Sequence, residues 1–450
     1  MTAFAEVAIT DGPGTRPRPR VHYTADDGWI NDPYGITWTG DRYRLFYQAI
    51  PGRVTWAPQA TWGQAESPDL VRWRPLEPAL TPQQFELGCW SGCAVPEGAG
   101  LRLFYTRVTE PDWGRGAIAV ARPAGPDGST WATRADDVAV AGPPAELGVR
   151  AFRDPFIFRH GDEWVMIVGA ALLDGAGAAI QFRSPDLESW TCDGLLASRL
   201  SKPDDACWTG NMWECPQFFQ LGDDWVLLVS VWHEDVLHHV AAGIGDYDGR
   251  RFTPRTWQQL TFGPSAYAMT SFTDRAGRRC VMSWLREEPQ NDPSLIGRAS
   301  AHSVAALLTA AGDGRLELRP HPDLAALAEP VAYPAGSTGP TRMPVGGRAV
   351  DLTLIAQPGL RVELVDGQHI LAALTYDGAS GGLHIARARH ADGVMPASSG
   401  HELRLLIDAD VLEVFGAGGY GAFRIGIPAD QDASEIVINP PHPEFSLRVF

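Results

Sequence analysis

A glycine turn followed by a strand rich in aromatic and β-branched residues recurs five times in the first two thirds of this chain. The phrases are GDRYRLFY from Gly40, GLRLFY from Gly100, GDEWVMIV from Gly161, GDDWVLLV from Gly222 and GRRCVMSW from Gly277. The glycines are 60, 61, 61 and 55 residues apart. A fixed period of this size is typical of repeat architectures, and four short strands with their turns fill about 50–60 residues. The repeat favours a five-bladed β-propeller over a chance recurrence of hairpins in a β-sandwich.

The period ends after Pro320, and residues 326–345 are rich in Ala, Pro and Gly. Alternating apolar segments resume from about Gly346 without the 60-residue spacing, which is typical of a β-sandwich. Helical periodicity is weak throughout. We therefore expect an all-β fold: an N-terminal tail at 1–17, a five-bladed β-propeller at 18–325, a linker at 326–345 and a C-terminal β-sandwich at 346–450.

Charge and composition exclude several classes of partner. The 37 basic and 54 acidic residues give a net charge of −17, which is the wrong sign for a nucleic-acid or anionic-membrane surface. No apolar run approaches the roughly 18 residues of a membrane span, and no apolar segment of a signal peptide follows the basic residues near the start. We expect a cytoplasmic protein whose six cysteines are reduced thiols. The oligomeric state is left open.

The repeat also aligns three carboxylates. Asp32 lies eight residues before Gly40, Asp154 lies seven before Gly161, and Glu214 lies eight before Gly222. In a propeller these positions fall on the innermost strand of each blade, which lines the central channel. A single Asp-Pro pair is usually a turn, but three acids at equivalent repeat positions indicate a site.

Aromatic and amide side chains gather at the same positions, among them Trp29, Asn31, Trp90 and Trp213. Carboxylates beside Trp rings and amide donors are typical of a carbohydrate-binding site, and glycoside cleavage requires a pair of carboxylates. No C-x₂-C pair is present, and the histidines of HEDVLH (233–238) are five residues apart in a strand-like segment. We therefore expect neither a metal site nor a cofactor.

Three ordered motifs resemble glycoside hydrolase family 32, the invertases and fructan hydrolases. They are WINDPYG (29–35), FRDP (152–155) and WECP (213–216), with further similarity at LFYQ (45–48), WSG (90–92) and LEVF (412–415). The resemblance runs from about residue 18 to residue 450. It implies the same propeller-plus-sandwich fold that the repeat predicts.

Residue by residue, the resemblance implies that Asp32 is the nucleophile, Glu214 the acid/base and Asp154 a stabiliser of the transition state. Eight further residues match family positions that line the fructosyl subsite: Asn31, Gln48, Trp56, Trp90, Ser91, Arg153, Tyr267 and Trp284. We expect Glu214 to be protonated at rest because of the field of Asp32. We also expect Arg153 to keep Asp154 ionised, and Cys215 to be a packed neighbour.

The chain departs from the family at Tyr34, where a second Asn is usual, at Gln64, where His is common, and over 296–302. We expect these changes on the leaving-group side of the site.

The leading hypothesis is a retaining β-fructofuranosidase that removes terminal fructosyl units from sucrose or short fructo-oligosaccharides. The alternatives are a fructosyltransferase using the same site, an inverting arabinan- or xylan-active propeller hydrolase, and a non-catalytic sugar-binding propeller. The expected partner is a small sugar, acted on from its end.

Overall fold

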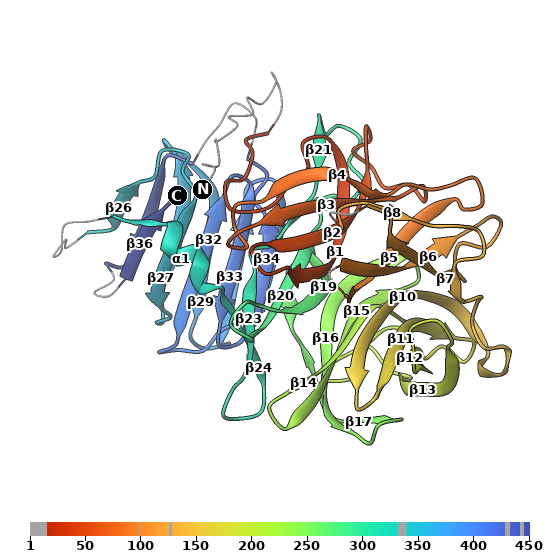
Figure 1. Cartoon of the computed structure of the whole chain (residues 1–450). Coiled ribbons are helices and arrows are strands. Elements are labelled where there is room, and N and C mark those ends of the chain that lie inside the picture. Colours follow the sequence, from red (N-terminus) through yellow and green to blue (C-terminus); the bar gives the residue numbers. More distant parts are fainter. Residues whose placement is uncertain (1–15, 99, 126–127, 332–338, 428–432, 442–444) are drawn as a thin grey trace.

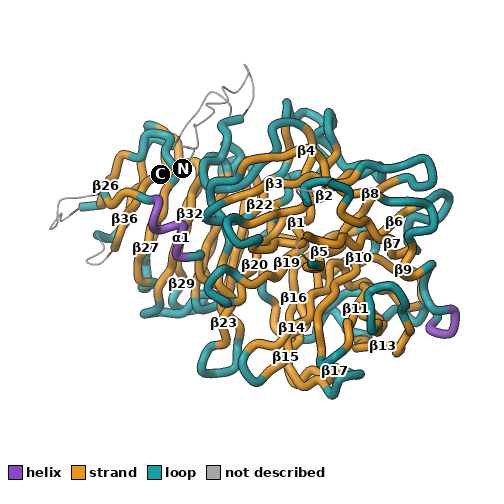
Figure 2. The backbone as a smooth tube through the Cα atoms, in the orientation of Figure 1, coloured by secondary structure: helices purple, strands orange, loops and turns teal. Residues whose placement is uncertain are grey.

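The computed structural model describes residues 16–98, 100–125, 128–331, 339–427, 433–441 and 445–450. Almost all of its regular structure is β-strand, and Figure 1 shows two parts side by side, a ring of blades and a smaller stack of two sheets. The predicted all-β fold of propeller plus sandwich is confirmed. The tube view in Figure 2 shows how little helix the described chain contains.

Each of the five blades is an antiparallel sheet whose strands follow one another along the chain. Blade I comprises β1 (Gly28–Trp38), β2 (Tyr43–Ile50), β3 (Thr61–Ser67) and β4 (Arg74–Leu80). Blade II comprises β5 (Gly88–Glu97), β6 (Gly100–Val108), β7 (Ala117–Pro123), β8 (Trp131–Ala132) and β9 (Val138–Val140). Blade III comprises β10 (Val149–His160), β11 (Glu163–Leu172), β12 (Gly177–Ser184) and β13 (Thr191–Arg199), preceded by the 3₁₀ turn Ala145–Leu147.

Blade IV comprises β14 (Met212–Leu221), β15 (Asp224–His233), β16 (Val236–Tyr247) and β17 (Phe252–Gln259). Blade V comprises β19 (Ala266–Thr273), β20 (Arg279–Leu285), β22 (Ala301–His302), β23 (Ala306–Ala310) and β24 (Leu316–Pro320). The repeated glycines lie in the turns between the first and second strands of blades I, III, IV and V, and Gly100 begins β6 in blade II. The sequence repeat is therefore the repeat of one hairpin.

A short parallel strand closes the ring between its last and first blades. β21 (Arg298–Ala299), which lies between β20 and β22 of blade V, pairs with β1, so that Gly28 lies opposite Arg298 and Trp29 opposite Ala299. An isolated bridge between Tyr23 and His302 adds to this junction. The junction brings the segment between β20 and β22 against the first residues of β1, the strand that carries Asp32.

The sandwich consists of a seven-stranded and a six-stranded sheet whose facing apolar side chains form one cluster. The first sheet has the order β18-β34-β33-β32-β27-β36-β25, with bounds β18 (Thr261–Phe262), β34 (Gly419–Arg424), β33 (Val411–Gly416), β32 (Glu402–Asp408), β27 (Val350–Ile355), β36 (Phe445–Val449) and β25 (Glu329–Pro330). The second has the order β26-β35-β28-β29-β30-β31, with bounds β26 (Thr341–Pro344), β35 (Glu435–Asn439), β28 (Arg361–Asp366), β29 (His369–Asp377), β30 (Gly382–Arg387) and β31 (His390–Pro396).

The connection between the two parts differs from the expected linker. A six-residue helix, α1 (Pro322–Leu327), starts at a Pro, with the ring of His321 accepting the N–H of Asp323 as its cap. The range 326–345 then contributes β25 and β26 to the two sandwich sheets, while 332–338 lies outside the described residues. We propose that the sandwich begins near Glu329, because strands in that range pair with β36 and β35.

Strand pairing and ion pairs also connect the propeller with the sandwich. β18, which follows blade IV, pairs in parallel with β34 of the sandwich. Of the expected N-terminal tail, residues 1–15 lie outside the described residues, as does most of the segment tested for a signal peptide. Arg16 forms ion pairs with Glu287 of the propeller and Asp410 of the sandwich. No helix among the described residues is long and apolar enough to cross a membrane.

Candidate active site

The five inner strands β1, β5, β10, β14 and β19 contact one another around the propeller axis. Each of them breaks its register with the second strand of its blade, at the places where site residues were predicted. The breaks fall at Ile30/Pro33, Trp90/Gly92, Arg153/Pro155, Glu214/Gln217 and Tyr267/Thr270. In a regular strand successive side chains point to opposite faces, whereas a bulge re-aims one of them. Each blade can therefore present neighbouring side chains to one site.

Asp32 is held by four donors. Its Oδ1 accepts from Asn31 Nδ2 at 3.0 Å, and its Oδ2 accepts from Ser91 Oγ at 2.6 Å and Gln48 Nε2 at 3.2 Å. The thiol of Cys215 donates to the same Oδ2 at 3.4 Å. Burial raises the pKa of Asp32, and the hydrogen bonds from Ser91 and Asn31 oppose that rise. Donors that fix both oxygens orient the carboxylate without adding a neighbouring positive charge.

Asp154 and Asp32 share one hydrogen-bond donor, Cys215. The backbone N–H of Cys215 donates to Asp154 Oδ2 at 3.0 Å, and its thiol lies 3.7 Å from that oxygen. Asp154 has φ 65° and Cys215 has φ 45°, a left-handed conformation that is uncommon for non-glycine residues. Burial raises the pKa of Asp154 to about 7, although the charge of Arg153 lowers it.

Glu214 receives the strongest donors in the site. Arg153 donates to Glu214 Oε1 from Nη2 at 2.7 Å and from Nε at 3.0 Å. The hydroxyl of Tyr267 donates to Oε2 at 2.5 Å. A charge-assisted fork of this kind stabilises an ionised carboxylate. The charge of Arg153 lowers the pKa of Asp154, as expected, but the guanidinium hydrogen-bonds to Glu214, and burial still raises the pKa of Asp154 to about 7. The resting protonation of Glu214 stays a prediction.

The predicted aromatic residues divide into two groups. Trp284 is buried behind the site, with its ring centroid 5.6 Å from that of Trp29 and 6.3 Å from that of Tyr267. Trp56 and Trp90 are partly exposed and lie edge to face at 5.8 Å. One apolar cluster includes all of these rings together with Cys215, and Leu237 and Leu295 pack against it. The structure thus brings together all eleven predicted residues, three acids and eight neighbours.

The three places where the chain departs from the family motifs differ in burial and contacts. Tyr34 is buried against Trp62, with ring centroids 4.3 Å apart, in the core between blades I and II. Gln64 is buried too, and donates to the carbonyls of Glu77 and Ser129. Within 296–302, Ile296 is exposed, whereas His302 is buried and bonds the carbonyl of Asn31. Gln64 and the ring of Tyr34 therefore take part in blade packing, while the Tyr34 hydroxyl lies within electrostatic reach of Asp32, Cys215 and Asp154. A role of these positions on the leaving-group side stays a prediction.

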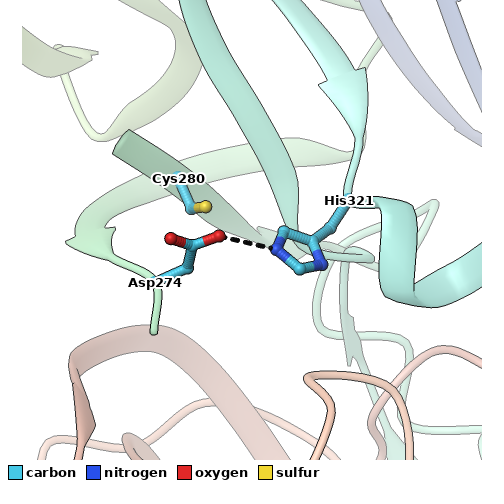
Figure 3. Close-up of side chains that lie close together, drawn as sticks. All are labelled: Asp274, Cys280 and His321. Carbon is cyan, nitrogen blue, oxygen red and sulfur yellow. Dashed lines mark hydrogen bonds and ion pairs between the residues drawn. The ribbon is translucent and has the colours of Figure 1, made fainter. Parts of the chain in front are cut away.

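The residues that could be mistaken for metal ligands have other partners. His233 and His238 lie on the two strands of the β15–β16 hairpin, and both rings pack against Trp208, at 5.1 Å and 4.7 Å. Among the described residues, Asp274, Cys280 and His321 form the one group close enough to hold an ion. Figure 3 shows the 3.0 Å contact between Asp274 Oδ2 and His321 Nε2.

In the group formed by Asp274, Cys280 and His321, a guanidinium already neutralises the carboxylate. Arg278 Nη2 lies 2.6 Å from Asp274 Oδ2 and 3.1 Å from His321 Nε2. The N–H groups of Ala276 and Arg278 also donate to Asp274, which closes the β19–β20 turn. These contacts, together with His321, hold the pKa of Asp274 at about 2 despite its burial. The cluster therefore ties the hairpin to the start of α1.

Comparison with known proteins decides the family. The profile of the glycosyl hydrolases family 32 N-terminal domain matches residues 22–320. The chain belongs to glycosyl hydrolase family 32. A sucrose-6-phosphate hydrolase of Escherichia coli is 33% identical over 285 residues, which are 59% of this chain and 57% of that relative. The chain therefore spans little more than half of that relative's length.

Other members of family 32 align over more of their length. A sucrose-6-phosphate hydrolase of Salmonella typhimurium is 29% identical over 90% of this chain and 87% of its own. The structure of a Bombyx mori β-fructofuranosidase of family 32 superposes with a TM-score of 0.80 at 24% identity, covering 96% of this chain and 93% of that one. That likeness supports the fold.

Sequence reasoning missed two residues of this family 32 site. Cys215 was expected only to pack, yet it bonds both Asp32 and Asp154. Its place between Glu214 and Pro216 in a predicted inner strand was the available signal. Thr106, on β6, accepts the backbone N–H of Asp154 at 2.8 Å and donates to the carbonyl of Ser91 at 3.0 Å. The sequence carries no signal for Thr106, because it lies on the second strand of another blade.

Proposed function

We propose that this chain is a retaining β-fructofuranosidase that releases terminal fructosyl units from sucrose or short fructo-oligosaccharides. The observation that carries the proposal is the convergence of Asp32, Asp154 and Glu214 on inner strands, each with a different set of partners. The names of the relatives in family 32, and the Bombyx mori structure in complex with sucrose, support the same substrate class.

In the first step Asp32 attacks the anomeric carbon of the fructosyl unit, and Glu214 gives a proton to the leaving oxygen. Asp32 suits the role of nucleophile because amide, hydroxyl and thiol donors orient it without an ion pair. Arg153 binds only Oε1 of Glu214, so Oε2 is the atom left to carry the proton. When Oε2 is protonated, the hydroxyl of Tyr267 can turn from donor to acceptor.

In the second step Glu214 accepts a proton from water, which attacks the fructosyl-enzyme and frees Asp32. Asp154 lies on blade III, next to the blade that carries Glu214, and Cys215 joins it to Asp32. We assign it the binding of sugar hydroxyls and the stabilisation of positive charge that develops on the ring. That role requires the ionised form, which a pKa of about 7 leaves in balance with the neutral form at neutral pH.

The decisive experiment incubates the purified chain with sucrose, sucrose 6-phosphate, 1-kestose, inulin and levan, and resolves the products by chromatography. Fructose, with glucose or glucose 6-phosphate as its companion, is the expected early product. Transfer products at high sucrose would indicate the fructosyltransferase instead. Absence of any turnover on all five fructosides would leave the arabinan- or xylan-active hydrolase and the sugar-binding propeller.

We further propose a cytoplasmic location for the protein. All six cysteines are free thiols, and four of them are buried, as is usual in a reducing compartment. Fractionation of the source cells, followed by activity on sucrose, tests this.

A further inference from the structure

Arg286 lies directly behind the proposed acid/base and belongs to none of the motifs discussed above. It follows β20, is buried, and places its guanidinium carbon 5.0 Å from the centroid of the Tyr267 ring. The hydroxyl of that ring donates to Glu214 Oε2 at 2.5 Å. One aromatic ring therefore separates a buried positive charge from the carboxyl that must gain and lose a proton.

The other contacts of Arg286 are carbonyls. Its Nη1 donates to Leu237 O at 2.8 Å, its Nη2 to His238 O at 2.9 Å, and its Nε to Ser265 O at 3.4 Å. Within the described part of the chain it makes no ion pair with a carboxylate. Burial lowers its pKa to about 10, against the opposing influence of Tyr267, Glu288 and Glu214. It remains a cation at neutral pH.

The same guanidinium binds the backbone of β16 beside the site. Leu237 and His238 belong to β16, next to the β15–β16 turn, and Leu237 packs against the cluster that contains Trp56 and Trp90. Arg286 thus donates two N–H groups to the backbone of β16, and its guanidinium lies over the ring of Tyr267. A cation over a tyrosine face is worth about 0.5–2 kcal/mol and makes the phenol a better donor.

We propose that Arg286 is a positioning residue for acid/base catalysis: through the face of Tyr267 it orients and polarises the hydroxyl that bonds Glu214. This inference rests on the proposed function, because it takes Glu214 as the acid/base.

The pH dependence of activity is set by the titratable and charged groups that surround Glu214 and Arg286. Glu214 faces Arg153 and Asp154 from β10, Asp32 from β1, its neighbour Cys215, and Tyr267 from β19. Arg286 faces Tyr267, Glu214, Glu288, His238 and His239. Glu288 is already paired with Arg387 at 2.6 Å. Tyr267 and Glu214 are therefore the groups that lose most when Arg286 is neutralised.

The test is Arg286→Gln, assayed on sucrose and on an aryl β-fructofuranoside. Protonation helps the departure of glucose far more than the departure of a stabilised phenolate. We expect kcat/KM on sucrose to fall about 5–10-fold, as loss of about 1 kcal/mol implies. We expect less than about a twofold fall on the aryl substrate. The upper pH limit of activity on sucrose should rise by about 0.5–1 unit, because the carboxylate loses a stabilising charge.

Arg279 supplies a matched control at the other end of β20. Its guanidinium carbon lies 4.3 Å from the centroid of Phe219, burial lowers its pKa to about 10, and within the described residues it too makes no ion pair. Arg279→Gln should leave the ratio of the two substrates and the pH profile unchanged. Arg286→Lys, which keeps the charge, should recover part of the lost activity on sucrose.

Tyr267→Phe keeps the test decisive if Arg286→Gln does not fold, because it removes only the hydroxyl. It should show the same selective loss on sucrose, and Arg286→Gln should add no further selectivity in that background. Equal losses on both substrates in Tyr267→Phe, or an unchanged ratio in folded Arg286→Gln, would overturn the inference. Asp32→Asn and Glu214→Ala in the same series test the proposed function separately: if both lose sucrose turnover, an unchanged Arg286 ratio refutes only this inference.

Discussion

The imidazole of His22 joins the start of the propeller to two acids of the sandwich. Its Nδ1 lies 2.8 Å from Asp408 Oδ2 and its Nε2 lies 2.6 Å from Glu413 Oε2, with all three side chains buried. Burial by itself lowers the pKa of His22. The charge of Glu413 and the hydrogen bonds to Asp408 and Glu413 outweigh that and raise it to about 9. The folded protein therefore holds a buried imidazolium between two carboxylates.

The consequence for stability follows from the difference between the folded pKa of about 9 and the ordinary value of 6.5. About 2.5 units at 1.36 kcal/mol each correspond to about 3 kcal/mol. Because the folded pKa is raised, this contribution is complete below pH 6.5 and is lost as the pH rises through 9. For a chain of this length about 3 kcal/mol corresponds to a Tm shift of roughly 3 °C.

The perturbation is His22→Gln, compared with the wild type by differential scanning calorimetry between pH 6 and pH 10. The variant should melt roughly 3 °C below the wild type at pH 6, and the gap should shrink to near zero at pH 10. His302→Gln is the control, because burial lowers the pKa of His302 to about 4 and its ring stays neutral across this range. A gap for His22→Gln that is constant with pH would refute the buried imidazolium.

Four further predictions concern catalysis. Asp32→Asn should lose several orders of magnitude of turnover with an unchanged circular dichroism spectrum, because an amide cannot attack the anomeric carbon; near wild-type activity would remove the nucleophile assignment. Glu214→Ala should lose least on substrates with good leaving groups, and an equal loss on all of them would argue against the acid role. Proton NMR of the first product should show retained anomeric configuration, whereas inversion would favour the arabinan- or xylan-active alternative. Early time courses on inulin should release fructose first, and mid-length oligosaccharides in its place would contradict exo-action.

Local sequence was sufficient to predict the architecture. A propeller hairpin is a local structure, so its glycine turn and apolar strand recur visibly at each repeat, and counting back from Gly40, Gly161 and Gly222 reached the inner strands. The sequence SPDL, which occurs at 67–70 and at 184–187, also forms a local structure. Asp69 and Asp186 each accept two N–H groups of the following turn, and Leu70 and Leu187 have φ 64° and 65°. Such contacts span only two or three residues.

The expected linker shows where local reasoning stopped. Residues 326–345 have a loop-like composition, yet β25 and β26 pair there with strands about 90–120 residues later in the sequence. Pairing of this kind depends on which sheet edge is free after the two sheets have stacked. The amino-acid pattern within 326–345 therefore does not predict which strands pair there.

The sequence by itself determined the repeat, the family resemblance and the three acids on their inner strands. Tertiary structure decided which charges meet. Arg153 and Asp154 are adjacent in sequence, but the bulge between them sends the guanidinium to Glu214 and the carboxylate to Cys215, one blade away. It also placed Arg286, which directly follows the fifth repeat strand and belongs to no family motif, over the ring of Tyr267. Partners across blades are fixed by bulges and packing, which depend on the whole closed ring.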